Sequence, residues 1–408
     1  MKLDQNRLER QKEGLSKWKA HNYTGTLEWA TGTGKTFAAI LAIKHLKNHI
    51  KSDLKVIVSV PTDNLRTQWR DLLAKFNLSG VYVDTVHTLI TSNHEVDFFI
   101  LDEIHSYTGG DEFSRLFDCV KRSYILGLTA KEQPHEKDRA VISEHCPVVD
   151  KISIADALES GFISPFVSYN LGLQFSESDQ RKYQRLNRDF HKYFSTFGHD
   201  FDLAMSCLGS SELRKKVAND VGMSEADVNI HTFQFNRVMQ KRKKYLYNAD
   251  ILVETTKAII EKFDTEQIIT FSESTAMADR LEQAIPDSKA YHSNLSTILI
   301  DGKKFGATRL KRQILADFKE GKLLRLHAAR ALNMGQDIPA IGTSIKTSFN
   351  STIIDAIQRL GRIVRKQPDK LAKEINLYII GTKSENWLRR SQVGLPNIKW
   401  INSIDEIV

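Results

Sequence analysis

The chain has 408 residues, more than one ordinary domain holds, and this length suits two or three domains. Hydrophobic residues make up 41% and charged residues 26%, a balance that excludes wholesale disorder. The formal net charge of +8 favours a polyanionic partner such as nucleic acid, because each Lys or Arg that neutralises a phosphate releases a counterion.

Neither a membrane segment nor a disulfide framework is indicated. The N-terminus is polar, without a signal peptide, and no apolar run approaches the roughly 18 residues that span a bilayer. Cys119, Cys146 and Cys207 lie far apart with no CxxC pair, which predicts neither disulfides nor a structural metal site. We therefore expect a cytoplasmic protein.

A glycine-rich loop follows the first predicted strand. The strand ends at Ala30, and residues 31–36 read Thr-Gly-Thr-Gly-Lys-Thr. Gly32 and Gly34 let backbone N–H groups approach phosphates, Lys35 adds a positive charge, and the Thr36 hydroxyl is a ligand suited to Mg²⁺. Trp29 stands where the strict GxxxxGK[ST] pattern has its first Gly. The sequence thus predicts that ATP and Mg²⁺ bind here, through Thr31, Gly32, Thr33, Gly34, Lys35 and Thr36.

A second acidic motif supports the same site. The mostly apolar run over residues 96–101 is typical of a buried parallel strand and ends in Asp102, Glu103, Ile104 and His105. We expect Asp102 to hold Mg²⁺, Glu103 to orient and deprotonate the attacking water, and His105 to form a coupling hydrogen bond across the cleft. The alternative for an Asp-Glu pair is a helix N-cap.

Strand-like runs and amphipathic helical stretches alternate up to about residue 150, and the alternation returns from residue 267. Such alternation predicts α/β lobes with parallel sheets. The predicted fold class is α/β, with two parallel-sheet lobes and a helical insertion between them. We expect lobe 1 over residues 1–150, a connecting strand and basic insertion over 151–250, lobe 2 over 251–385, and a C-terminal appendage over 386–408.

The insertion carries two features of interest. Its aromatic series falls at spacings of three and four, which favours a packed helix face over a base-stacking platform; the series is Phe190, Tyr193, Phe194, Phe197 and Phe201. Ala218, Gly222 and Val228 have the spacing of a helix-turn-helix, although helix pairs joined by Gly are common. A basic run follows and is predicted to contact duplex DNA: Lys241, Arg242, Lys243 and Lys244.

The second lobe contains a pair of arginines that suit an ATPase closed by domain motion. Arg362 and Arg365 lie three residues apart, on one face of a predicted helix that also carries Gln358. Two permanently charged guanidinium groups can stabilise charge on a γ-phosphoryl group when the lobes close. The alternative is a surface helix with scattered arginines.

In their order along the chain, these motifs resemble those of superfamily 2 DExH-type helicases over roughly residues 5–385. The DEIH box, the ATGTGKT loop and the QRLGRIVR segment look most like the DNA-translocating branch that includes XPB, RecG-like and UvsW-like proteins. The compact two-lobe chain is similar to a phage-encoded branch-migration helicase of the T-odd coliphages. The resemblance implies two RecA-like lobes and translocation along one strand of branched DNA, from 3′ to 5′. If the chain is phage-encoded, it would act in the host cytoplasm.

The resemblance also implies roles for single residues. Gln11 would read adenine, Gly335 and Asp337 would lie at the nucleotide, and Thr129 would relay nucleotide state, although this chain keeps only one of the two hydroxyls usual there. Contacts to the nucleic-acid backbone would come from Thr62, Arg66, Thr85, Ser272 and Arg330. An exposed helical Gln is the alternative for Gln11, and helix caps are the alternative for the threonines.

The function predicted from the sequence is an ATP-dependent DNA helicase or translocase that acts on single-stranded and forked or branched DNA, as a monomer, in recombination, replication or repair. A DExH RNA helicase is one alternative, because the shared motifs contact the sugar-phosphate chain more than the bases. A nucleotide-gated clamp without motor activity is another, and a translocase subunit of a restriction enzyme stays open.

Overall fold

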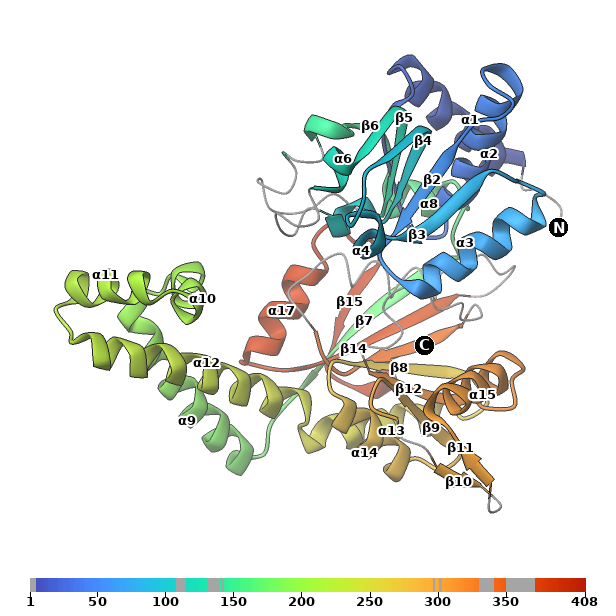
Figure 1. Cartoon of the computed structure of the whole chain (residues 1–408). Helices are drawn as coiled ribbons and strands as arrows, with labels where there is room; N and C mark the ends of the chain where they lie inside the picture. The colour runs from blue at the N-terminus through green and yellow to red at the C-terminus, as the bar shows by residue number, and fades with distance from the viewer. Residues whose placement is uncertain are drawn as a thin grey trace.

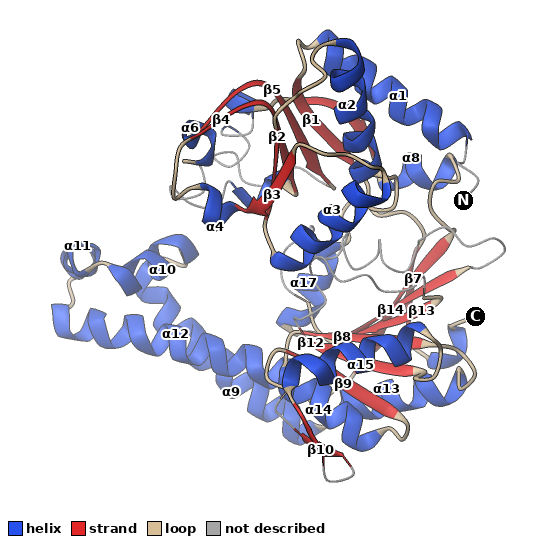
Figure 2. Ribbon diagram, turned by 45° about the vertical axis from the view of Figure 1, so that its right-hand side comes forward, coloured by secondary structure: helices blue, strands red, loops and turns tan. Residues whose placement is uncertain are grey.

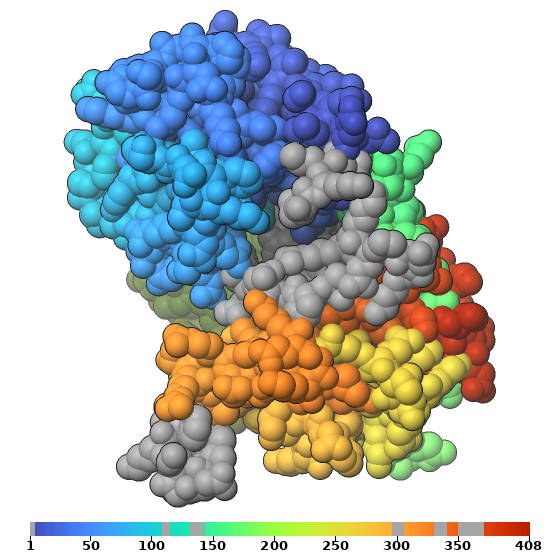
Figure 3. Space-filling view, turned by 90° about the vertical axis from the view of Figure 1, so that its right-hand side faces the viewer, coloured from blue at the N-terminus to red at the C-terminus, as the bar shows by residue number. Residues whose placement is uncertain are grey.

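The computed structural model describes residues 5–107, 115–130, 140, 143–295, 298–300, 303–329, 341–349 and 371–408. Two α/β lobes lie one above the other, and an arm of helices projects from the side (Figure 1). Figure 3 shows the N-terminal lobe above the C-terminal lobe from another side. The predicted fold class, two parallel-sheet lobes with a helical insertion, is confirmed.

Lobe 1 is built on a parallel sheet with the strand order β3-β2-β4-β5-β1-β6. Its central strands are apolar on both sides, and all five residues of β2 are buried, as expected when helices cover both faces of a sheet. The strands are β1 (Thr24–Trp29), β2 (Val56–Val60), β3 (Val81–Thr85), β4 (His94–Asp102), β5 (Val120–Thr129) and β6 (Val148–Ile152).

Helices pack on both faces of this sheet (Figure 2). The C-terminal ends of parallel strands lie at one edge, so the loops after β1, β4 and β5 meet there. These loops carry the glycine-rich segment, the Asp102-Glu103 pair and Thr129. The helical elements are α1 (Gln5–Ala20), α2 (Lys35–His49), α3 (Asp63–Lys75), α4 (Val86–Leu89), the 3₁₀ turn η1 (Ile104–Tyr107), α6 (Leu116–Cys119) and α8 (Ile154–Glu159).

The arm is a helical hairpin with its own small core. Phe190 and Phe197 are buried, and Phe201 is 48% exposed, so the aromatic series is mostly core, as predicted. Gly222 adopts a left-handed conformation (φ 67°) and ends one helix, after which Ser224 caps the next. The elements are α9 (Glu177–Phe194), the 3₁₀ turn η2 (Ser195–Phe197), α10 (Phe201–Gly209), α11 (Ser211–Val221) and α12 (Glu225–Tyr247).

Lobe 2 has a second parallel sheet, with the order β15-β7-β14-β13-β8-β12-β9. The strands are β7 (Phe166–Leu173), β8 (Ile268–Ser272), β9 (Ser288–His292), β12 (Arg325–Ala329), β13 (Thr343–Lys346), β14 (Ala372–Ile379) and β15 (Ile398–Ile401), with a separate hairpin of β10 (Ile298–Ile300) and β11 (Lys303–Phe305). The helical elements are α13 (Asp250–Lys262), α14 (Thr275–Ala284), α15 (Ala307–Lys319), α17 (Lys383–Ser391) and the 3₁₀ turn η3 (Ile404–Glu406).

The second sheet corrects two expectations about the ends of the lobes. The strand expected as a connector, β7, is an inner strand of lobe 2 between β15 and β14. Residues expected as an appendage supply β15, which pairs with Ser168–Leu171 and buries Ile401. Both segments therefore belong to lobe 2, because backbone pairing joins strands more than 200 residues apart in sequence.

None of the helices in the described part of the chain is both long and apolar enough to cross a membrane. All three cysteines are free thiols.

Candidate nucleotide and nucleic-acid site

The glycine-rich loop runs from the end of β1 into the N-terminus of α2. Gly32 and Gly34 have φ values of 90° and 93°, the left-handed region that favours glycine. Gly34 holds the N-cap position of α2 without a side-chain cap, so the first N–H groups of this 15-residue helix receive no side-chain acceptor from that position. A helix N-terminus of this kind attracts anions.

Lys35 lies at the start of α2 and is partly buried. Its Nζ donates to the carbonyl oxygen of Trp29 at 2.9 Å. Burial lowers the pKa of Lys35, and the negative charges of Glu103 and Asp102 oppose that shift. The lysine from the loop and the two carboxylates at the end of β4 therefore form one electrostatic unit.

Gln11 lies against the loop from α1. It is only 3% exposed, and its Nε2 donates to the carbonyl oxygens of Thr33 at 3.0 Å and Gly34 at 3.3 Å. The alternative of an exposed helical Gln is therefore wrong. A side-chain amide carries one acceptor and two donors, the groups needed to read a base edge. Gln11 is placed beside the loop where that reading would occur.

Asp102 is buried at the end of β4. Its Oδ2 accepts a hydrogen bond of 2.7 Å from Trp69 Nε1, and its Oδ1 accepts one of 3.1 Å from the Glu103 N–H. Burial, and after it the Glu103 carboxylate, raise the pKa of Asp102, while the Trp69 and Lys35 contacts act against the rise. A buried carboxylate with a second carboxylate beside it favours a bound cation.

Glu103 is held in a strained backbone conformation. Its φ of 52° is unusual for a non-glycine residue and costs roughly 1–3 kcal/mol. Its Oε2 lies 3.4 Å from His105 Nδ1, and the same nitrogen lies 3.0 Å from the Thr129 hydroxyl. The catalytic carboxylate predicted from the sequence is thus joined through one imidazole to the end of β5.

The loop fits a bound triphosphate. The Thr31 hydroxyl is buried and has no hydrogen-bond partner among the described residues, a state that costs free energy unless a ligand supplies the partner. The glycine conformations and the N-terminus of α2 suit phosphate oxygens, and Thr36 with Asp102 would hold Mg²⁺. When bound, the ion neutralises charge on the phosphates.

Trp69 is a residue of this site that the sequence reasoning did not assign. It belongs to α3, is 1% exposed, and donates directly to the carboxylate of Asp102. The only available signal was its place in the segment Gln68-Trp69, which resembles a nucleic-acid contact of the helicases. A sequence does not reveal that an indole N–H reaches a carboxylate 33 residues away.

The predicted nucleic-acid contacts of lobe 1 have local partners. Thr62 caps α3 by accepting from the Leu65 N–H at 3.4 Å, which is the alternative considered above. Arg66 pairs with Asp84 at 2.8 Å and Asp63 at 2.7 Å. Thr85 lies at the N-cap position of α4 without capping it, and its hydroxyl contacts that of Thr88 at 3.2 Å.

In lobe 2, Ser272 is 2% exposed, and its hydroxyl donates to the carbonyl oxygen of Ser274 at 2.7 Å. This burial does not support Ser272 as a nucleic-acid contact. The remaining predicted residues of the lobe lie outside the described part of the chain: Arg330, Gly335, Asp337, Gln358, Arg362 and Arg365.

The basic run of α12 divides between surface and core. Lys241 and Lys244 are exposed, and Lys243 is partly buried with its ammonium 5.5 Å from the centre of the Tyr247 ring. Arg242 is buried: its guanidinium lies 3.7 Å from the centre of the Phe190 ring and donates to Asn187 Oδ1 at 2.7 Å. Arg242 therefore stabilises the arm, and we remove it from the predicted DNA contacts.

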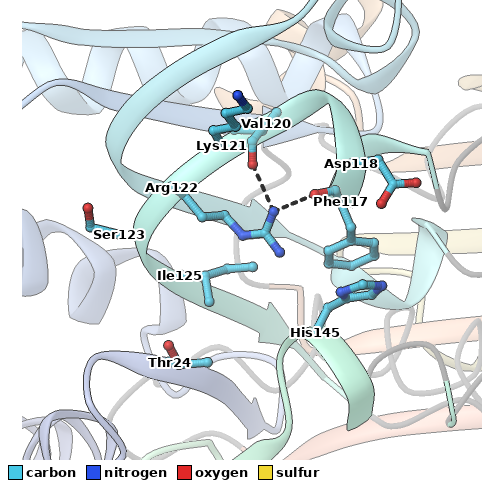
Figure 4. Close-up of a pocket in the computed structure, with 9 residues that line it drawn as sticks. All are labelled: Thr24, Phe117, Asp118, Val120, Lys121, Arg122, Ser123, Ile125 and His145. Carbon is cyan, nitrogen blue, oxygen red and sulfur yellow. Dashed lines mark hydrogen bonds between the residues drawn. The ribbon is translucent and has the colours of Figure 1, made fainter.

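A cavity of about 390 Å³ lies at the opposite end of the lobe 1 sheet, where β1 and β5 begin (Figure 4). Phe117 and His145 stack with ring centres 4.4 Å apart. Arg122 donates to the carbonyl oxygens of Phe117 at 2.5 Å and Val120 at 2.8 Å, shown by the dashed lines. The guanidinium is held within the wall, and the phosphate loop lies at the other edge of the sheet.

Two family models match the chain. Residues 2–95 match the model described as "Type III restriction enzyme, res subunit", and residues 250–367 match "Helicase conserved C-terminal domain". A DNA 3′-5′ translocase, XPB2 of Sulfurisphaera tokodaii, is 25% identical over 402 residues, which cover 93% of this chain and 83% of the relative.

Two solved structures share the fold. The Hef helicase domain of Pyrococcus furiosus superposes with a TM-score of 0.55 at 16% identity, and the match covers 94% of this chain and 97% of that one. The ATP-dependent Type ISP restriction-modification enzyme LlaBIII, solved bound to DNA, gives a TM-score of 0.60 at 16% identity, covering 98% of this chain and 31% of that one.

Proposed function

We propose that this chain, a superfamily 2 helicase by its two matched domains and its paired lobes, is an ATP-driven translocase that moves on DNA. The observation that carries the proposal is the convergence of Lys35, Asp102 and Glu103 at one edge of the lobe 1 sheet, next to Gln11. A degenerate nucleotide-binding clamp has no need of a complete hydrolytic set.

The residues divide the chemistry between them. The loop N–H groups and Lys35 hold the phosphates, and Thr36 and Asp102 hold Mg²⁺. Glu103 orients a water molecule and accepts its proton as the oxygen attacks the terminal phosphate. Gln358, Arg362 and Arg365, which the sequence assigns to lobe 2, would complete the site when the lobes close, with Gly335 and Asp337 at the nucleotide.

DNA is the proposed track. The relative XPB2 is named a DNA 3′-5′ translocase, and this chain has a net charge of +8. Exposed side chains of α12 form a stripe at helical spacing that is apolar toward the tip and basic toward the lobes: Ile230, Phe233, Arg237, Lys241 and Lys244. Cations on one face of a projecting helix suit a duplex arm of a fork.

The direction of movement and the DNA substrate are inferred from the resemblance of the motifs to those of DNA-translocating helicases. We propose movement from 3′ to 5′, action as a monomer on forked or branched DNA, and unwinding or branch migration in recombination, replication or repair. The protein type proposed is a phage-encoded branch-migration helicase, which the motifs of the chain resemble. The buried coupling of Glu103 to Thr129 through His105 supports a motor over a static clamp.

The test is steady-state ATP hydrolysis without nucleic acid and with single-stranded DNA, single-stranded RNA or forked DNA. Lys35→Ala, prepared in parallel, excludes contaminating activity. We expect DNA to stimulate turnover, the fork most strongly, and the variant to lose it. Preference for RNA would replace the DNA proposal with an RNA helicase, and tight ATP binding without turnover would replace the motor with a clamp.

A further inference from the structure

Trp29, the residue that occupies the position of the first Gly in the strict phosphate-loop pattern, is the centre of a buried polar cluster. Its side chain is completely buried, and its indole Nε1 donates to Asp150 Oδ2 at 2.7 Å. Asp150 lies on β6, next to β1 in the sheet. The aromatic side chain therefore ties the strand before the loop to the neighbouring edge strand.

The same carboxylate anchors α1. Arg10 Nη1 lies 2.7 Å from Asp150 Oδ2, and Lys17 Nζ lies 2.6 Å from Oδ1. The Arg10 guanidinium also lies 5.7 Å from the centre of the Trp29 ring. Burial acts to raise the pKa of Asp150, but the ion pair with Arg10 and the hydrogen bonds from Lys17 and Trp29 lower it overall. The carboxylate is thus ionised, and its contacts hold both α1 and the Trp29 indole.

Gly14 permits this close approach. A Cβ at Gly14 would overlap the Trp29 ring and come within 2.9 Å of Asp150 Oδ2. Arg10, Gly14 and Lys17 fall at i, i+4 and i+7, so one face of α1 meets the Trp29–Asp150 pair over two turns. This contact fixes the distance of α1 from the sheet and the position of the helix along its own axis.

Gln11 is next to Arg10 on this helix, and its amide reaches the loop carbonyls at 3.0 and 3.3 Å. A shift of α1 by one ångström would break these contacts, because hydrogen bonds weaken steeply with distance and angle. We propose that Asp150, with Trp29, is a positioning residue that sets the place of Gln11 at the nucleotide and thereby the preference for adenine. The inference rests on ATP being the nucleotide used.

The test compares Asp150→Asn with the wild type in equilibrium binding of ATP and of GTP, in KM and kcat for ATP, and in melting temperature. Asn has the same shape but lacks the charge that holds two cations. We expect the Kd and KM for ATP to rise about tenfold, as for other residues that orient a ligand-binding group. The ratio of ATP affinity to GTP affinity should fall as the Kd for ATP rises, and kcat should change less than twofold.

Three further variants separate positioning from stability. Asp97→Asn removes a carboxylate that pairs with Lys51 at 2.9 Å at the start of β4, away from α1, and should leave nucleotide preference unchanged. In a Gln11→Ala background, Asp150→Asn should have no further effect on ATP binding, because the group it positions is gone. Lys17→Met, at a side chain that is 57% exposed, should give a smaller change in the same direction.

The proposal fails if Asp150→Asn lowers the melting temperature without changing the ATP-to-GTP ratio, or if its effect adds fully to that of Gln11→Ala. If Asp150→Asn does not fold, Lys17→Met takes its place. The proposal is then decided by the ATP-to-GTP ratio of Lys17→Met and by whether its effect adds to that of Gln11→Ala. Equilibrium nucleotide binding tests the positioning role of Asp150 independently of whether the protein is a motor. A wild-type chain that binds ATP over GTP but turns over no ATP on any nucleic acid refutes the motor and still tests the positioning.

Discussion

The imidazole of His105 joins the loop after β4 to the end of β5, with 3.0 Å between its Nδ1 and the hydroxyl oxygen of Thr129. The same nitrogen lies 3.4 Å from Glu103 Oε2. Both His105 and Thr129 are buried, at 4% and 1% exposure. The helicases that this chain resembles usually have two hydroxyls in the segment of Thr129. The single hydroxyl of Thr129 is therefore sufficient to form the contact with His105.

Thr129→Val should separate hydrolysis from its stimulation by DNA. Valine keeps the shape of threonine but removes the hydroxyl that His105 contacts. We expect turnover without DNA to be retained and stimulation by DNA to fall by about fivefold or more, the size of a typical coupling between sites. Steady-state ATPase assays over a DNA titration measure both quantities. Thr256→Val, an equally buried threonine of α13, is the control. Equal loss of basal and stimulated turnover would contradict the coupling role.

Trp69→Phe should weaken the use of Mg²⁺. The indole N–H is a hydrogen-bond donor to Asp102 Oδ2, and phenylalanine leaves that oxygen without it. We expect the Mg²⁺ concentration for half-maximal turnover to rise about tenfold, as when other side chains that hydrogen-bond to a metal ligand are removed. Trp18→Phe controls for loss of a buried indole, since Trp18 donates to the Ile125 carbonyl oxygen instead. An unchanged Mg²⁺ requirement would exclude this role.

Replacing Arg237, Lys241 and Lys244 with Ala should weaken fork binding and flatten its salt dependence. Each lost phosphate contact reduces the slope of log K against log salt by about 0.9. The matched control replaces three exposed lysines of lobe 2, Lys257, Lys289 and Lys322. Fork-binding titrations at several salt concentrations measure the slope, and the same slope in both triple variants would refute the α12 surface.

Arg242→Met should instead destabilise the arm. The guanidinium contacts Phe190 and Asn187 inside the insertion, so its loss leaves Asn187 Oδ1 without that donor. We expect a lower melting temperature and an unchanged salt slope of fork binding for the molecules that remain folded. A reduced slope at constant stability would return Arg242 to the DNA contacts.

His327 should make lobe 2 sensitive to acid. It is 1% exposed on β12, neither ring nitrogen has a hydrogen-bond partner in the described part of the chain, and burial lowers its pKa to about 3. The unfolded chain binds a proton near pH 6.5 and the folded chain does not, so stability falls as the pH drops from 6.5 toward 3. The free energy of unfolding, measured with urea at several pH values, should depend less on pH in His327→Leu than in the wild type. The same measurement on His21→Asn, at an exposed histidine, should match the wild type.

Much of the nucleotide site was predictable because each of its motifs is short and has specific chemistry. Thr31–Thr36 follow an apolar strand, and the Asp102-Glu103 pair lies at the end of another, so a parallel sheet brings them to one edge. Gln11 lies against the loop, and its reading of adenine stays a prediction. Ser272 and Arg242 were predicted as nucleic-acid contacts, yet both are buried, because residue type and local spacing do not reveal whether a polar side chain is enclosed by the fold.

The two α/β lobes, the phosphate loop and the acidic pair could be read from residue order alone, since hydrophobic period and short motifs depend on neighbours along the chain. Three features became visible only in the folded chain: β15 completes the second sheet, Trp69 holds Asp102, and Asp150 binds Trp29, Arg10 and Lys17 together. Each of these depends on a contact between residues 33 to more than 200 positions apart. Such contacts form because packing and hydrogen bonding join distant segments, which local pattern does not encode.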